Sequence, residues 1–148
     1  MKRLLVVLFL LLASVGSKAQ ELPPFTPATK TRMADLYIAA ARTFMGAGKD
    51  EFAMTVDDEG NPSEITTSHD YMRDIVHVHK GDTAIIHTHP YGCSPQPSPG
   101  DAQTARAAGI PNYVLSQFAL WVVMPDGTIH KVADVAFKHG GIVLKEAK

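Results

Sequence analysis

Near the start of the chain, the spacing of apolar residues follows a helical period. From residue 31 onward, apolar side chains return every three or four positions, and Gly46 interrupts the run. This spacing predicts a helix from Thr31 to Gly46 with one face suited to packing on a sheet. The residues of that face are Met33, Leu36, Tyr37, Ala40 and Phe44.

The next segments alternate between apolar and polar positions, which is the period of a strand. The segment "EFAMTV" (residues 51–56) predicts a half-buried strand that begins at Glu51. A shorter strand is expected from Ile65. The segment "DIVHVHKGDTAIIHTHP" (residues 74–90) predicts two strands joined by a turn at residues 80–82, the second of which ends in two histidines.

A second helix is expected over "SPGDAQTARAAG" (residues 98–109), with Ser98 as N-cap, Pro99 in the first turn and Gly109 at the end. The apolar residues 113–137 then predict further strands that turn at residues 125–127. These elements indicate an α+β fold in which a mixed or mostly antiparallel β-sheet is flanked by helices.

The first residues have the pattern of an export signal. A basic start is followed by an apolar run and a small-x-small cleavage site, which predicts a signal peptide over residues 1–19. The apolar run is shorter than the about 20 residues of a membrane span, so we expect no stable membrane anchor after cleavage. Residues 20–29 contain several prolines and predict an extended lead-in to a single domain over residues 30–148. The mature protein is therefore expected to be exported, either periplasmic or secreted.

Charge and cysteine content narrow the classes of function. The 148 residues carry a formal net charge of -1 without a long block of one sign, which argues against a nucleic-acid partner. Cys93 is the single cysteine, so no disulfide within the chain is possible. Neither feature indicates an oligomeric state.

Two histidines and an acid have the spacing of a metal site. On a strand, His87 and His89 point to the same face, and Asp101 follows at the first turn of the second helix. Four prolines in the intervening loop restrict its freedom and so reduce the entropy cost of presenting the third ligand. A catalytic zinc ion takes three such ligands and keeps a fourth position for water. This pattern predicts Zn²⁺ as cofactor.

The segments "HTHP" (residues 87–90) and "SPGD" (residues 98–101), with a glutamate upstream, resemble the JAB/MPN family of zinc metalloproteases, also called JAMM peptidases. The resemblance implies a JAB/MPN-like (cytidine-deaminase-like) fold with zinc ligands His87, His89 and Asp101. It also implies that Glu51 is the general acid/base and that Ser98 stabilises the oxyanion. The loop "YGCSPQP" between proline and serine is one residue longer than is usual in the family.

Several residues in this region have alternative interpretations. Glu59 and Glu64 also lie upstream, although a turn rather than a strand is expected around them. Ser98 and Asp101 would serve equally as ordinary helix caps. Cys93 is a possible extra metal ligand that would close the fourth position.

The leading hypothesis is an exported zinc-dependent hydrolase, a metallopeptidase or isopeptidase whose partner is a peptide or protein substrate. One alternative is a catalytically inactive binding module with the JAB fold. Another is a periplasmic metal-binding protein in which His77 and His79 join His87 and His89, as the expected pairing of the two histidine strands would allow.

Overall fold

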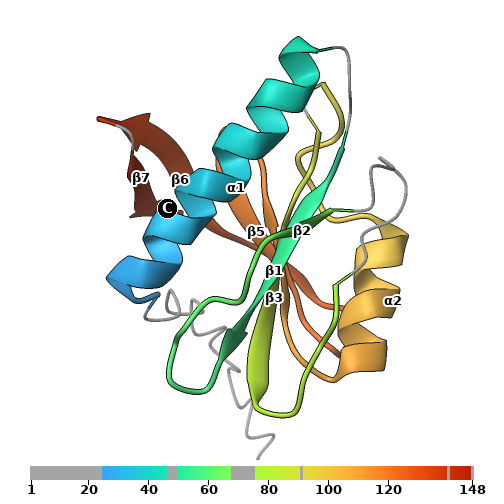
Figure 1. The fold of residues 1–148 in the computed structure, drawn as a ribbon. Helices are drawn as coiled ribbons and strands as arrows, with labels where there is room; N and C mark the ends of the chain where they lie inside the picture. The colour runs from blue at the N-terminus through green and yellow to red at the C-terminus, as the bar shows by residue number, and fades with distance from the viewer. Residues whose placement is uncertain (1–24, 47–49, 68–75, 91, 140, 148) are drawn as a thin grey trace, which may run out of the picture.

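The structure is a computed structural model that describes residues 25–46, 50–67, 76–90, 92–139 and 141–147. The expected signal peptide and most of the expected lead-in lie outside these residues. Within them, the chain forms two helices and one curved sheet of seven strands (Figure 1). None of the described helices has the length and apolar character needed to cross a membrane.

Helix α1 (Pro27–Met45) begins four residues earlier than its apolar spacing predicts. The Thr29 N–H donates to the side-chain oxygen of Thr26 at 3.2 Å, which caps the first turn. Pro27 follows this cap at the position where its fixed φ favours a helix. The prediction of an extended segment through residue 29 is therefore wrong for its last three residues, because the local cap outweighs the proline content.

The sheet contains one parallel pair in an otherwise antiparallel order, β2-β1-β3-β4-β5-β6-β7. The parallel pair is β3·β4, and α2 (Pro99–Ala108) is the crossover between these two strands. An α+β fold with a mixed sheet is thus confirmed. The strands are β1 (Phe52–Asp57), β2 (Thr66–Thr67), β3 (Asp82–Thr88), β4 (Asn112–Leu115), β5 (Ala119–Val123), β6 (Ile129–Lys138) and β7 (Gly141–Glu146).

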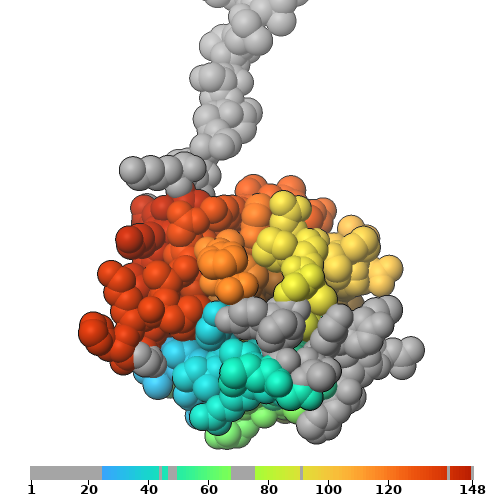
Figure 2. Space-filling view, turned by 90° about the horizontal axis from the view of Figure 1, so that it is seen from above, coloured from blue at the N-terminus to red at the C-terminus, as the bar shows by residue number. Residues whose placement is uncertain are grey.

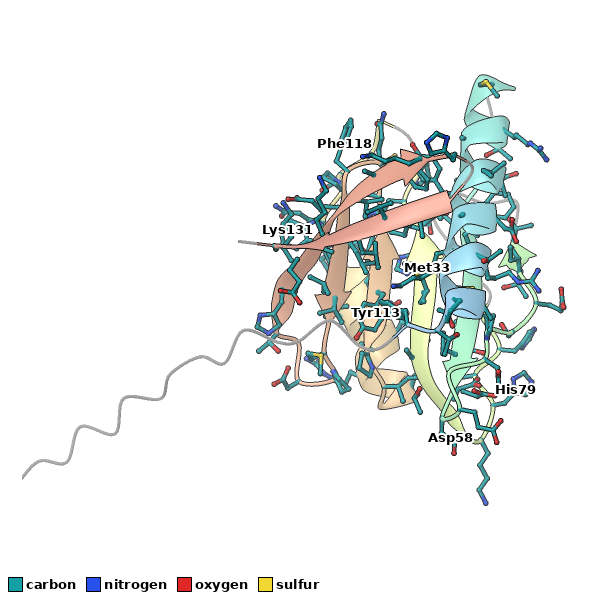
Figure 3. The ribbon with its side chains drawn as sticks, turned by 90° about the vertical axis from the view of Figure 1, so that its left-hand side faces the viewer. Met33, Asp58, His79, Tyr113, Phe118 and Lys131 are labelled. Atoms are coloured by element: carbon teal, nitrogen blue, oxygen red, sulfur yellow. The ribbon has the colours of Figure 1, made fainter. Side chains whose placement is uncertain are left out.

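The main hydrophobic core lies between the sheet and α1. Met33 and Leu36 of the helix are fully buried against alternate residues of the central strands, such as Met54 and Ile86. Figure 3 shows Met33 directed from α1 toward the strands and Tyr113 on the same side of the sheet. The helical spacing therefore predicted this buried face correctly for Met33, Leu36 and Ala40.

Helix α2 covers the opposite face of the sheet, over β4 and β5. Both of its predicted ends are confirmed, because Ser98 is the N-cap and Gly109 closes the helix with a φ of 71°. Residues Ile85, His87, Asn112 and Val114 point toward this side, since they alternate with the core residues of β3 and β4. The main hydrophobic core and the polar cluster described below thus lie on opposite faces of the sheet.

The predicted strand immediately before the turn at residues 80–82 is wrong for the part that is described. Residues 76–79 are not in a strand. The physical reason is that both edges of β3 are already occupied, one by β1 and the other by β4. Residues 68–75 lie outside the described part of the chain. Strand β7, which was not predicted, pairs with β6 and packs on α1.

Candidate metal centre

His87, His89 and Asp101 meet where β3 ends and α2 begins. The Nε2 atom of His87 lies 3.0 Å from Oδ1 of Asp101, and Nε2 of His89 lies 3.3 Å from Oδ2 of the same carboxyl group. The potential ligand atoms of the three residues all lie within 4.8 Å of one another. Within the described ranges, these three residues form the one group of His, Cys, Asp or Glu side chains with this property.

Asn112 determines which nitrogen of His87 carries the proton. Its side-chain amide nitrogen donates to the backbone carbonyl of Asp101 at 3.2 Å, so its carbonyl oxygen faces Nδ1 of His87 at 3.0 Å. Because that oxygen only accepts, Nδ1 must be the donor. The Nε2 atom of a neutral His87 therefore carries a lone pair that is directed toward Asp101.

His89 is oriented in the same way by the backbone of the proline-rich loop. Its Nδ1 lies 2.7 Å from the carbonyl oxygen of Ser94, which is also an acceptor only. Nδ1 is thus the protonated nitrogen and Nε2 is the available ligand atom. A carbonyl acceptor behind a ligating histidine is the usual support of a protein metal site, because it fixes both the tautomer and the ring orientation.

Asp101 is an ionised carboxylate in this arrangement. Burial by itself would raise its pKa, but hydrogen bonds with His87 and His89, the charge of a protonated His87 and the Ser98 backbone N–H together hold the pKa well below its usual range. The carboxylate also accepts from the Ser98 N–H, while the Ser98 side chain accepts from the Asp101 N–H at 3.2 Å. These reciprocal bonds form a capping box. The capping interpretation is therefore confirmed, and the same residue still faces both histidines.

The donor set fits a divalent metal ion. With each Nδ1 donating to an acceptor, each Nε2 faces a carboxylate oxygen at 3.0 to 3.3 Å, a contact that a proton on Nε2 bridges and that a bound cation would bridge in its place. Ligand atoms about 2.0 to 2.1 Å from a tetrahedral zinc ion would lie about 3.3 Å apart. The three residues are therefore close enough together to bind a metal, and in this respect the cluster resembles a JAMM motif.

Glu51 lies at the same end of the sheet as the three candidate ligands. It directly precedes β1, and the register Ala53↔His87, continued by two residues, places it opposite His89. It lines a cavity of about 1100 Å³ together with His87, His89 and Asp101. By contrast, Glu64 is 90% exposed beside Arg32, and Glu59 is an exposed residue of the β1–β2 turn. Of the three candidate glutamates, Glu51 is the one that lines the cavity.

Ser98 and Cys93 both line this cavity from the loop side. The Ser98 oxygen accepts the helix N–H, which leaves its own proton available to a bound group. Cys93 is exposed and does not belong to the group of mutually close ligand atoms. The structure thus does not place the Cys93 sulfur among the candidate ligand atoms, as the sequence had allowed.

The prediction of a metal site formed by four histidines is wrong. His77 and His79 are exposed and are not part of a strand. Figure 3 places His79 beside Asp58, at the end of the molecule opposite Phe118. The expected strand pairing that would have brought these histidines to His87 cannot form, because β1 and β4 occupy both edges of β3.

Two groups orient the histidines without having been predicted from the sequence, Asn112 and the Ser94 carbonyl. A backbone carbonyl carries no signal in a sequence. A polar residue at the start of an apolar strand, as in "NYVL", is a weak signal that becomes meaningful only once β4 is known to lie beside β3.

Comparisons with known protein families, curated proteins and solved structures gave no match for this chain.

Proposed function

We propose that this protein is a zinc-dependent hydrolase of the JAMM type that acts on a peptide or isopeptide bond, with the JAB/MPN-like fold that such an activity implies. The observation that carries the proposal is the orientation of the ligand atoms. Two histidines have their Nδ1 atoms tied to acceptors, so both Nε2 atoms face one ionised carboxylate. A glutamate lines the same cavity, which is what hydrolysis requires in addition to a metal.

His87, His89 and Asp101 would hold the ion. A zinc ion in such a site lowers the pKa of a coordinated water to about 7 and polarises a carbonyl group. The carboxylate of Glu51 accepts a proton from the attacking water and returns it to the nitrogen of the leaving amine. The hydroxyl of Ser98 donates to the oxygen of the attacked carbonyl as negative charge develops there.

The metal part of the proposal is tested by elemental analysis of the purified protein. We expect about one zinc ion per chain, as an open three-ligand site predicts. His89→Ala and Asp101→Ala should both lose it, whereas His79→Ala is a matched control that should keep it. Zinc that persists in the Asp101 variant would contradict the site.

The hydrolytic part is tested with a mixture of peptides of defined sequence, with mass spectrometry as the readout. Glu51→Gln keeps the shape of the side chain but removes the proton acceptor, so it should bind zinc normally and lose cleavage by about 100-fold or more. Glu64→Gln is the control and should cleave like wild type. Equal rates for wild type and Glu51→Gln would refute a hydrolase that uses Glu51.

We also propose that the protein acts outside the cytoplasm. The proposal is supported by the basic and apolar pattern of residues 1–19, which ends in a small-x-small motif. Mass spectrometry of the protein recovered from a bacterial periplasm should find a chain that begins at Gln20. A full-length chain that stays with the cytosol would refute it.

A further inference from the structure

A second, smaller cavity of about 250 Å³ lies on the other side of His89 from the polar cluster. Its walls come from α1, from the ends of β3 and β4 and from the loop that follows His89. Figure 2, seen from above, shows the orange β4–β5 turn beside the yellow loop, with light-blue and teal residues of α1 below them in the view. The apolar lining residues are Tyr37, Ala40, Pro90, Pro95, Leu115 and Phe118.

Phe118 is placed at this cavity by a rigid turn. The turn joins β4 to β5, and the Ser116 N–H and hydroxyl both donate to the Ala119 carbonyl at 2.9 Å, while the Ala119 N–H donates back to the hydroxyl at 3.2 Å. Phe118 is nevertheless 68% exposed, and Figure 3 shows it at the end of the molecule opposite His79. An aromatic ring kept in water on a preorganised turn is typical of a binding surface.

The two cavities are neighbours, because two residues, His89 and Cys93, line both of them. A peptide whose backbone passes the Nε2 atom of His89 would therefore have a neighbouring side chain at the entrance of the smaller cavity. This cavity lies below the about 300 Å³ at which pockets for drug-sized ligands begin, which is the scale of one side chain rather than of a whole ligand.

We propose that this cavity is a specificity pocket that accepts one aromatic or large aliphatic side chain of the substrate, next to the bond that is cleaved. The inference rests on the proposed hydrolase for its meaning, but the binding itself requires neither zinc nor turnover. No acidic or basic side chain lines the pocket among the described residues apart from His89, so charged side chains would lose their hydration there without a partner.

Cys93 provides a direct readout of occupancy, because it is exposed, is the single cysteine of the chain and lines the pocket. The rate at which Cys93 reacts with a thiol reagent would be measured in the zinc-free full-length mature protein. The probes are the N-acetyl amides of phenylalanine, leucine, alanine and aspartate, each tested up to its solubility. The phenylalanine and leucine probes should slow the reaction, with apparent affinities about tenfold higher than that of the alanine probe.

Two variants locate the protection. Phe118→Ala removes an exposed ring without disturbing the core and should abolish the difference between the phenylalanine and alanine probes. Ile129→Ala is the matched control, because Ile129 is also an exposed apolar residue (46%) but lies on β6 and does not line the pocket. It should preserve the protection seen in the wild type.

The outcomes separate this inference from the proposed function. Equal protection by all four probes, or unchanged protection in Phe118→Ala, would overturn the specificity pocket even if zinc-dependent cleavage were found. Selective protection without any cleavage by the zinc-loaded protein would retain the pocket and refute the hydrolase. If the pocket and the hydrolase are both confirmed, peptides with phenylalanine or leucine beside the cleaved bond should be hydrolysed about tenfold faster than their alanine counterparts. Phe118→Ala should remove that preference.

Discussion

At the scale of single residues, Asn112 has a role that its chemistry alone does not reveal. Its side-chain amide makes two hydrogen bonds: the nitrogen donates to the Asp101 carbonyl, and the oxygen accepts from His87 Nδ1. It therefore links the strand that carries one candidate metal ligand to the helix turn that carries another. The full burial of His87 and Asn112 makes these bonds costly to lose.

Replacing Asn112 by leucine should weaken zinc binding by about 10- to 100-fold, because the buried Nδ1 of His87 would lose its acceptor. Asn112→Asp is the matched variant, since it keeps an acceptor at the same position and should retain most of the affinity. Competition with a chromophoric zinc chelator measures both. Equal affinities in the two variants would show that Asn112 does not orient His87.

The three candidate metal ligands were predictable from the sequence, whereas the groups that orient them were not. Alternation along a strand already places His87 and His89 on one face, and the S-x-x-D spacing places Asp101 on the next helix turn. Asn112 enters the cluster only because β4 lies parallel to β3 with Ile85 opposite Asn112. That pairing is a long-range property, and no local pattern in the sequence expresses it.

At the scale of elements, α2 combines a stabilising cap with a site residue. Ser98 caps the helix and also lines the cavity, so a loss of activity after its substitution would be ambiguous without a control for stability. Gly109 offers that control at the other end of the same helix. Its φ of 71° strains any other residue, and a Cβ there would meet no atom within 4 Å.

Ser98→Ala and Gly109→Ala should each lower the free energy of unfolding by about 1 kcal/mol, the first by removing the cap and the second by forcing a left-handed alanine. Both should keep their zinc, because the ligands remain. Only Ser98→Ala should reduce kcat, by about 100-fold, if its hydroxyl stabilises the developing oxyanion. Urea denaturation and peptide cleavage would be measured on the same samples. If both variants lost the same fraction of activity, Ser98 would act only as a helix cap.

The elements that local signals define were predicted best. Helix α2 has its cap residues within its own segment, and α1 has a regular apolar face, so both were expected near their observed positions. The predicted hairpin before residue 82 was wrong because the neighbours of β3 come from distant parts of the chain. Alternation shows that a segment is a strand, but it does not show which strand lies beside it.

At the scale of the whole molecule, the sheet separates the stabilising core from the candidate site. The main hydrophobic core packs between α1 and one face, while the polar cluster lies under the start of α2 on the other. Substitutions in the core should therefore change stability with little effect on zinc binding. Tyr113 is the most informative core residue, because it is buried, has a ring contact with Phe25 and carries an ionisable group.

Burial raises the pKa of Tyr113 from its ordinary value of 10.0 to about 12. In the unfolded chain the same group ionises near pH 10, so the folded state binds the proton more tightly. The stability from the neutral phenol is complete below pH 10 and is lost progressively between pH 10 and 12. Urea midpoints measured across this range should fall more steeply for the wild type than for Tyr113→Phe, which has no such proton. Identical slopes would mean that the Tyr113 hydroxyl reaches solvent in the folded protein, and that α1 covers this face of the sheet less tightly than its packing indicates.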